Sequence, residues 1–177
     1  MLLTQSTKNK LYLICPTDSI ETVIYESFAG EPFFYTALGA YFQLDLQSQF
    51  KLVDLVKSKK IEQIVLISSI NNVFFKYVFG NKNKLDFPIL KSLSQIKKKA
   101  FPGIEYPEVF ASNFHLLAVK HLMHQKNRLI NSSFFGRYLK NEKIIVQALV
   151  YQPNEKAFYD LKETERLGIL MESIAYN

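Results

Sequence analysis

The sequence lacks tryptophan and has a single cysteine, Cys15, among its 177 residues. One cysteine cannot form an intramolecular disulfide, and it excludes structural zinc sites built mainly from cysteine. Only six glycines are present, and they form neither a Walker motif nor a dinucleotide-binding fingerprint. A Gly-x-Ser-x-Gly elbow is missing as well. Because these motifs are missing, the sequence gives no support to nucleotide binding or to acyl transfer by a serine hydrolase.

Long apolar runs are also missing. No run approaches the roughly 20 residues that a helix needs to span a bilayer. The first residues, Met-Leu-Leu-Thr-Gln-Ser, lack a basic segment followed by an apolar core, so no signal peptide is indicated. We therefore expect no membrane partner and a cytoplasmic location. The length and the 48% hydrophobic content suit one globular domain, which we expect to cover residues 1–177.

The positive charge is modest, with a formal net charge of +6. Its clearest clusters are Lys57 to Lys60 and Lys97 to Lys99, and each could contact phosphates. Both clusters fall where helices are expected to end, and cations there interact favourably with the helix dipole. No RNP, zinc-finger or helix-turn-helix signature accompanies them. We do not expect nucleic-acid binding, although a basic α/β module that binds nucleic acid or acidic partners remains an alternative.

Aromatic residues are abundant, in contrast to the features above. The chain contains fifteen phenylalanines and ten tyrosines. Such side chains dominate the energetics of cores and are enriched at protein interfaces. The excess therefore favours an aromatic core together with an oligomeric assembly.

Three short apolar runs in the first half predict buried strands, at residues 11–15, 33–39 and 61–67. Residues 43–58 have the apolar spacing of an amphipathic helix. A helix between two such strands is typical of a parallel βαβ unit. The first half of the chain thus predicts an α/β fold.

The second half continues this pattern. A long amphipathic helix is predicted at about residues 108–126 and a shorter one at 134–139. Residues 143–151 predict a strand that turns back as a hairpin into residues 157–159. A final helix is predicted from the apolar residues on one of its faces, Leu167, Leu170, Met171 and Ile174.

Two segments show no clear period. Residues 71–80 are apolar on every side of a helix or strand, so we expect them to be buried or at an interface. Residues 87–99 are compatible with a helix or with an irregular connection. Both segments are left open at this point.

The three histidines are His115, His121 and His124. The last two are three residues apart, which places them on one face of the predicted helix, where they could begin a metal site. A catalytic zinc needs three protein ligands, and no acidic residue lies at helical spacing. We interpret His121 and His124 as surface or helix-end residues, and His115 as packed or hydrogen-bonded.

Cys15 ends the first predicted strand, where parallel sheets present functional groups. It could be a nucleophile or a lone metal ligand. A reactive thiol needs a neighbouring base or a positive field, and the sequence shows neither locally. A buried, inert cysteine is therefore the favoured interpretation.

The order of elements over about residues 11–161 resembles the β-class carbonic anhydrases. In that family one strand ends in Cys-x-Asp-x-Arg, which supplies a zinc ligand and an Asp/Arg pair. Here the strand runs into Cys15-Pro16-Thr17-Asp18-Ser19. Cys15 matches the ligand, Asp18 comes one residue late, and the arginine is absent.

The next two strand ends of the family are matched less well. A turn like Arg-Asn-Ala-Gly corresponds here to residues 36–40, of which Gly39 is kept. A strand that ends in Gly-His-x-x-Cys-Gly corresponds to residues 61–73, and Ser69 and Asn72 stand at the two ligand positions. The resemblance implies that three residues line the old active-site cleft: Thr36, Gly39 and Ser68.

The resemblance implies an α/β fold with a mainly parallel central sheet flanked by helices, closed by a C-terminal strand, a hairpin and a helix. It also implies assembly as a homodimer. Family chemistry uses zinc hydroxide to attack carbon dioxide. One matching ligand, Cys15, cannot hold a catalytic zinc ion, because losing two ligands removes most of the binding energy. We expect no zinc cofactor at the degenerate positions.

The function expected from this resemblance is that of a pseudoenzyme: a cytoplasmic homodimer without carbonate dehydratase activity, serving a binding, regulatory or scaffold role. An alternative is an enzyme with relocated chemistry, in which Cys15 and Asp18, with His115, act in the old cleft. The residues do not identify a ligand, a partner or a pathway.

Overall fold

The computed structural model of the chain describes residues 8–80, 86–102 and 111–161. Within these residues one five-stranded sheet has the order β2-β1-β3-β4-β5. The first four strands are parallel, and β5 is antiparallel to β4. The strands are β1 (Lys10–Ile14), β2 (Pro32–Thr36), β3 (Gln63–Ser69), β4 (Ile145–Gln152) and β5 (Ala157–Asp160).

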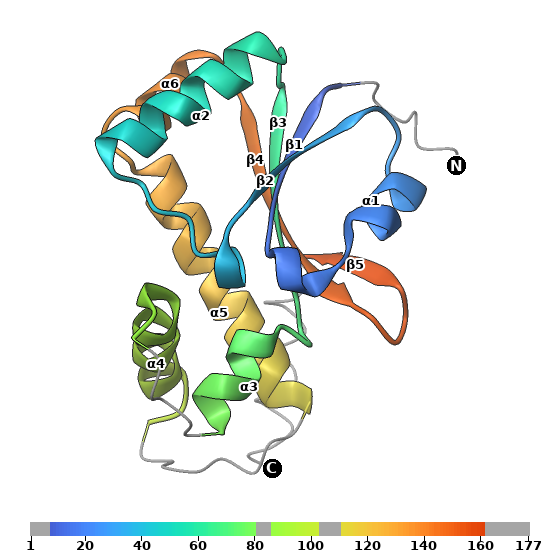
Figure 1. Cartoon of the computed structure of the whole chain (residues 1–177), viewed down its shortest axis with the longest axis vertical. Coiled ribbons are helices and arrows are strands. Elements are labelled where there is room, and N and C mark those ends of the chain that lie inside the picture. The colour runs from blue at the N-terminus through green and yellow to red at the C-terminus, as the bar shows by residue number, and fades with distance from the viewer. Residues whose placement is uncertain (1–7, 81–85, 103–110, 162–177) are drawn as a thin grey trace.

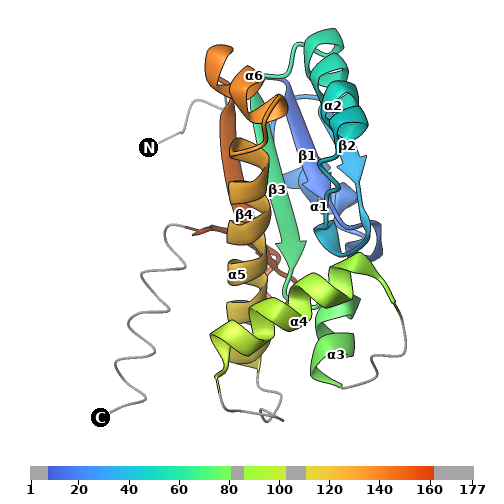
Figure 2. The ribbon, with the colours of Figure 1, turned by 90° about the vertical axis from the view of Figure 1, so that its left-hand side faces the viewer.

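Helices cover the two faces of the sheet unequally. In Figures 1 and 2, α2, α5 and α6 lie over one face and the short α1 over the other, while α3 and α4 lie below the carboxyl ends of the strands. The predicted α/β fold with a mainly parallel sheet is therefore confirmed. The helices are α1 (Glu21–Ser27), α2 (Leu46–Ser58), α3 (Val73–Phe79), α4 (Pro88–Ala100), α5 (Ala111–Ile130) and α6 (Phe135–Asn141), with two 3₁₀ turns, η1 (Pro16–Asp18) and η2 (Leu38–Ala40).

The central strands are apolar because both of their sides are buried. Leu11 and Leu13 point into a large core under α2 and α5, whereas Tyr12 and Ile14 join a smaller core under α1. Near-continuous apolar strands are typical of parallel sheets with both faces covered. The predicted strands are confirmed with small changes at their ends, and β2 stops at Thr36, three residues early, because η2 follows it.

The two segments without a clear period are both helices. Asn72 caps α3, since its side-chain oxygen accepts a hydrogen bond from the Phe74 N–H at 3.0 Å. Pro88 is the first residue of α4, a position that proline favours because no partner for its missing N–H is needed there. The all-round apolar character of α3 reflects burial of Phe74, Phe75 and neighbouring residues.

The predicted final helix beyond residue 161 and the start of the long helix before residue 111 lie outside the described residues. Among the residues that are described, no helix combines the length and the apolar character needed to cross a membrane.

Candidate functional site

The carboxyl ends of β1, β2 and β3 bring the sequence-predicted site residues to one edge of the sheet (Figure 1). Ile14 is paired with Thr36, so Cys15 and the η2 turn begin side by side. Ser68 and Ser69 end β3, the strand next to β1. Parallel strands place their carboxyl ends together, and for this reason residues distant in the chain meet here.

Cys15 is held inside the protein by the turn after β2. Its sulfur accepts a hydrogen bond from the Gly39 N–H at 3.0 Å and lies 3.0 Å from the Thr17 hydroxyl. The Cys15 side chain is fully buried. Gly39 has a positive φ of 61°, and a Cβ there would lie 2.5 Å from the Ile89 side chain. Only glycine therefore allows the close approach that directs this N–H at the sulfur.

Asp18 crosses from η1 to the end of β3. One carboxylate oxygen accepts a hydrogen bond from the Ser69 N–H at 2.9 Å, and the other accepts one from the Asn72 side-chain amide at 2.7 Å. Burial raises the pKa of Asp18 to about 6, against the opposing effect of these two hydrogen bonds, and the nearby Glu21 charge raises this pKa further. Asp18 is thus a poorly solvated carboxyl group bound by two neutral donors.

The side chains at the two degenerate ligand positions have internal partners. The Ser69 hydroxyl accepts a hydrogen bond from the Asn71 N–H at 3.1 Å. The Asn72 side-chain nitrogen donates a hydrogen bond to Asp18, and its side-chain oxygen caps α3. Asp18, Ser69 and Asn72 consequently form one connected hydrogen-bond network, which we call the strand-end network. Sequence reasoning placed these residues at one site but did not foresee that they bind one another.

His121 departs from the sequence interpretation as a surface or helix-end residue. It is fully buried, and its Nε2 lies 2.8 Å from the Gly39 carbonyl oxygen, to which it donates. Burial lowers the pKa of His121 to about 4, so the ring is neutral. The interpretation was wrong because Leu117, His121 and Gln125 form a buried stripe on α5. His121 contacts Gly39 in η2, and Gln125 accepts a hydrogen bond from the Phe42 N–H just after η2. The four-residue spacing of these side chains was the available signal.

The other histidines follow the sequence interpretation more closely. His124 is exposed on α5, and His115 is half-buried. Burial lowers the pKa of each ring. Within the described residues, no group of three or more histidine, cysteine, aspartate or glutamate side chains is placed to hold a metal ion. His121 and His124 therefore do not join a wider ligand cluster there.

The three residues predicted to line the old cleft share this edge of the sheet. Thr36 is exposed, whereas Gly39 and Ser68 are buried. The Ser68 hydroxyl has no hydrogen-bond partner within the described part of the chain. Their role as cleft-lining residues stays a prediction.

Solved structures of β-carbonic anhydrases share this fold. The wild-type enzyme CafD of the filamentous fungus Aspergillus fumigatus aligns with a TM-score of 0.72 and 21% identity, over 89% of this chain and 91% of that chain. A tetrameric enzyme from Sordaria macrospora aligns with a TM-score of 0.70 and 12% identity, over 88% and 81% of the two chains. The Coccomyxa enzyme in complex with acetazolamide gives 0.64 and 16%, over 88% and 72%.

These alignments define the class of protein: a parallel α/β protein with the β-carbonic anhydrase fold. No family model matches the chain, and no curated protein matches it. The predicted resemblance to β-carbonic anhydrases is confirmed at the level of the fold. At identities this low the likeness does not extend to the reaction.

The residues at the family's metal positions do not fit zinc. Cys15 offers one thiol, Ser69 a neutral hydroxyl and Asn72 a neutral amide. Zinc in proteins is bound by thiolate, imidazole or carboxylate groups, usually four in structural sites and three in catalytic ones. The carboxylate of Asp18, which lies beside these positions, already has both oxygens in hydrogen bonds. No step of a zinc reaction can be derived from this donor set.

Proposed function

We propose that this chain is a β-carbonic anhydrase-like protein that holds no zinc, does not hydrate carbon dioxide, and works by binding, in a regulatory or scaffold role. The observation that carries the proposal is the strand-end network, in which the Asp18 carboxylate binds the Ser69 N–H and the Asn72 amide. Hydratase chemistry in this family needs zinc hydroxide. The network supplies internal hydrogen bonds at the positions where ligands would be required.

The network supports a structural role for this edge of the sheet. It connects η1 to the end of β3 and to the cap of α3, which are 51 and 54 residues away from Asp18 in the chain. A second connection joins Cys15 to Gly39 and, through the Gly39 carbonyl, to His121 on α5. The side chains of Asp18, Asn72 and Cys15 all have hydrogen-bond partners within the protein, which supports a structural role without a metal. In the described part of the chain, the buried Ser68 hydroxyl and His121 Nδ1 have none.

The alternative with relocated chemistry around Cys15 has weaker support. The thiol is fully buried, and a nucleophile must be reachable by its substrate. Its polar contacts are an amide N–H and the Thr17 hydroxyl, neither of which is a general base.

A homodimer in the cytoplasm is the assembly and location that we propose. The high content of phenylalanine and tyrosine supports an oligomer, and one solved relative of this fold is described as tetrameric. Sedimentation or light scattering of the purified protein gives the mass in solution, and a monomer at micromolar concentration would contradict the homodimer.

The proposal is tested by measuring metal content and carbon dioxide hydration on the same purified sample. We expect no stoichiometric zinc and a hydration rate equal to that of buffer. A matched pair of double variants checks the ligand positions: Ser69→His with Asn72→Cys restores the family's ligand types, whereas Ser69→Ala with Asn72→Ala does not. Zinc uptake is expected only in the double variant that carries Ser69→His and Asn72→Cys. Stoichiometric zinc with hydration in the unmodified chain would overturn the proposal.

A further inference from the structure

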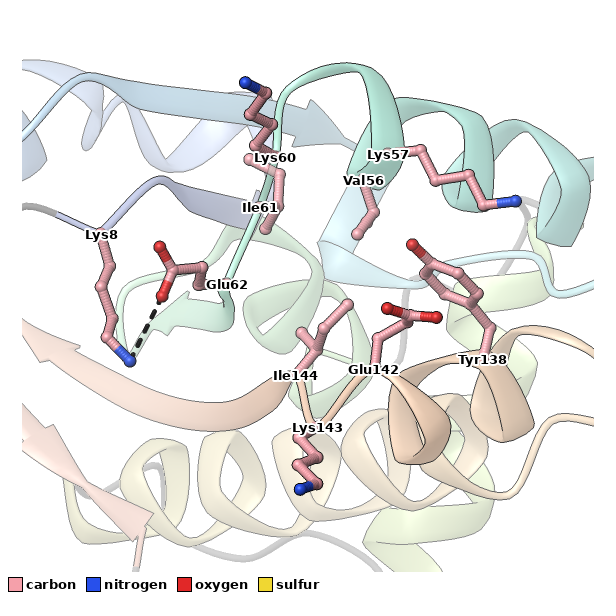
Figure 3. Close-up of a pocket in the computed structure, with 10 residues that line it drawn as sticks. All are labelled: Lys8, Val56, Lys57, Lys60, Ile61, Glu62, Tyr138, Glu142, Lys143 and Ile144. Atoms are coloured by element: carbon pink, nitrogen blue, oxygen red, sulfur yellow. Dashed lines mark ion pairs between the residues drawn. The ribbon is translucent and has the colours of Figure 1, made fainter.

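The opposite end of the sheet contains an open pocket. It has a volume of about 450 Å³ and lies where α2 and α6 end and where β3 and β4 begin (Figure 3). Most of its exposed lining is polar, and the buried Val56 and Ile61 with the half-buried Ile144 lie at its floor. This volume is typical of small-molecule sites. The other lining residues are Lys8, Lys57, Lys60, Glu62, Tyr138, Glu142 and Lys143.

The charges around this pocket are unbalanced. Lys8 and Glu62 pair with each other at 3.4 Å. Within the described part of the chain, the remaining lysines, Lys57, Lys60 and Lys143, have no ion pair. They face one further carboxylate, that of Glu142, and two helix ends that carry roughly half a negative charge each. The balance is an excess of about one positive charge beside an apolar floor.

Two of these lysines occupy backbone positions that favour glycine. Lys60 follows α2 with a φ of 49°, and Lys143 follows α6 with a φ of 55°. In both turns the next residue's N–H bonds back to the helix: Ile61 to the Val56 carbonyl and Ile144 to the Leu139 carbonyl, each at 2.9 Å. Glycine is the usual residue at this left-handed position after a helix. Lys156 in the β4–β5 hairpin has a similar φ of 49°, so the backbone conformation by itself does not indicate a ligand. What distinguishes Lys60 and Lys143 is that they stand on two sides of one pocket.

We propose that the pocket between the ends of α2 and α6 binds a small phosphorylated molecule, whose phosphoryl group is held by Lys57, Lys60 and Lys143. In Figure 3 the amino groups of these lysines extend away from the hollow, and the apolar side chains lie toward its centre. A lysine side chain has a flexible four-carbon stem, so the three amino groups can turn toward a bound anion. The floor of Val56, Ile61 and Ile144 would contact the apolar part of such a ligand.

A small molecule is favoured over a nucleic acid because the excess charge surrounds one hollow. A binding surface for single strands combines a basic groove with aromatic side chains on which bases stack. Among the described residues, Tyr138 is the only aromatic residue that lines this pocket, and Lys57 already lies over its ring, 5.4 Å from the centroid. The inference is independent of the zinc question, since the pocket lies at the other end of the strands.

The test is calorimetric titration of the full chain with inorganic pyrophosphate at low ionic strength. We expect saturable binding that Lys60→Gly and Lys143→Gly each weaken about fivefold, as loss of one charged contact does. Glycine suits the left-handed backbone, so both variants are expected to stay folded. Glu142→Gln is expected to strengthen binding about twofold, because it removes the facing negative charge.

Lys156→Gly is the matched control. Lys156 also has a left-handed backbone, with a φ of 49°, but it lies in the β4–β5 hairpin away from the pocket. Its replacement removes the same charge and should leave affinity unchanged. The proposal would be overturned by absence of saturable binding, by an equal loss in Lys156→Gly, or by weaker binding in Glu142→Gln. It would also be overturned by a single-stranded oligonucleotide that binds more tightly than pyrophosphate and is affected equally by all three glycine variants.

Discussion

The two ends of the parallel sheet differ in whether their polar side chains bind partners within the protein or are exposed to solvent. At the carboxyl end, Asp18, Asn72 and Cys15 are turned toward partners within the protein. At the amino end, Lys60 and Lys143 are exposed and lie around an open pocket. Open α/β sheets usually bind ligands at their carboxyl ends. In this chain Asp18, Asn72 and Cys15 at the usual functional end have internal partners, although the buried Ser68 hydroxyl has none among the described residues. The opposite end has lysines without an ion pair in the described part of the chain.

At the carboxyl end, polar side chains join segments that lie far apart in the chain. The Asp18 carboxyl group bridges η1 to the end of β3 and to the cap of α3, so each hydrogen bond to it joins segments more than fifty residues apart. The contrast also predicts that substitutions at the carboxyl end cost stability, whereas substitutions at the amino end are tolerated or stabilising. The following predictions test that difference.

The largest expected effect is that of Gly39→Ala at the carboxyl end. The new Cβ would lie 2.5 Å from Ile89 Cγ1, and the backbone would keep a positive φ. Overpacking and backbone strain together should lower the free energy of unfolding by about 4 kcal/mol, measured by denaturant titration. The control is Gly30→Ala, also at positive φ, where the nearest atom is 3.6 Å away and a loss of only about 1 kcal/mol is expected. Equal losses would show that close packing around η2 is not what requires glycine.

A smaller effect is expected from titration of Asp18. The pKa of its carboxyl group is about 6 in the folded chain, raised by burial from 3.8. Between these values the folded state binds more protons than the unfolded state, so this group adds stability as the pH falls from 7 to 4. The gain should be on the order of 2–3 kcal/mol relative to Asp18→Asn, which cannot titrate.

Urea unfolding of the Asp18→Asn variant and the unmodified chain at several pH values measures this gain. Other titrating groups contribute equally to the stability of both proteins. The informative quantity is therefore the difference between the two free energies of unfolding at each pH. Parallel stability curves across that pH range would show that the half-buried Asp18 carboxyl group is well solvated and that its pKa is not raised.

At the amino end the expected change has the opposite sign. Lys60→Gly removes a side chain from a left-handed position and should raise the free energy of unfolding by about 1 kcal/mol. Lys143→Gly should do the same after α6. Thermal unfolding of both variants gives the measurement, and a lower melting temperature would mean that the lysine stems contribute packing that outweighs the strain.

The smallest effect is expected for Lys8→Gln. Its ion pair with Glu62 spans 3.4 Å between side chains that are 45% and 56% exposed. Solvent screens such a pair, so the free energy of unfolding should change by less than about 0.5 kcal/mol. A chemical denaturation curve shifted by more than that would indicate that Lys8 has a further structural contribution at the edge of the pocket.

Much of the fold was predictable from local patterns. The apolar runs that became β1 and β3 are continuous because both faces of these strands are covered, and such runs are visible in the sequence. The segment that became α3 was not predictable, because its phenylalanines are buried on several sides and leave no period. The start of η2 was also missed, since the strand run continued to Gly39 in the sequence.

The place of the candidate residues in the fold was predictable, whereas the hydrogen bonds between them were not. Cys15, Ser69 and Asn72 were placed at one sheet edge by the resemblance, and the structure brings them to that edge. The bond between Asp18 and Asn72 was not foreseeable, because it depends on the exact position of a 3₁₀ turn. The burial of His121 depends likewise on how α5 meets η2.

The sequence by itself determined the chemical inventory of this protein: one thiol, no imidazole at the expected strand end, and apolar strands suited to a parallel sheet. Only the tertiary structure decided that the Asp18 carboxylate accepts a hydrogen bond from the end of β3. It also decided that Lys60 and Lys143 lie on two sides of one pocket. The physical reason is chain distance. Local patterns record which residues a helix or strand contains, whereas contacts between residues more than fifty positions apart depend on how the finished elements pack.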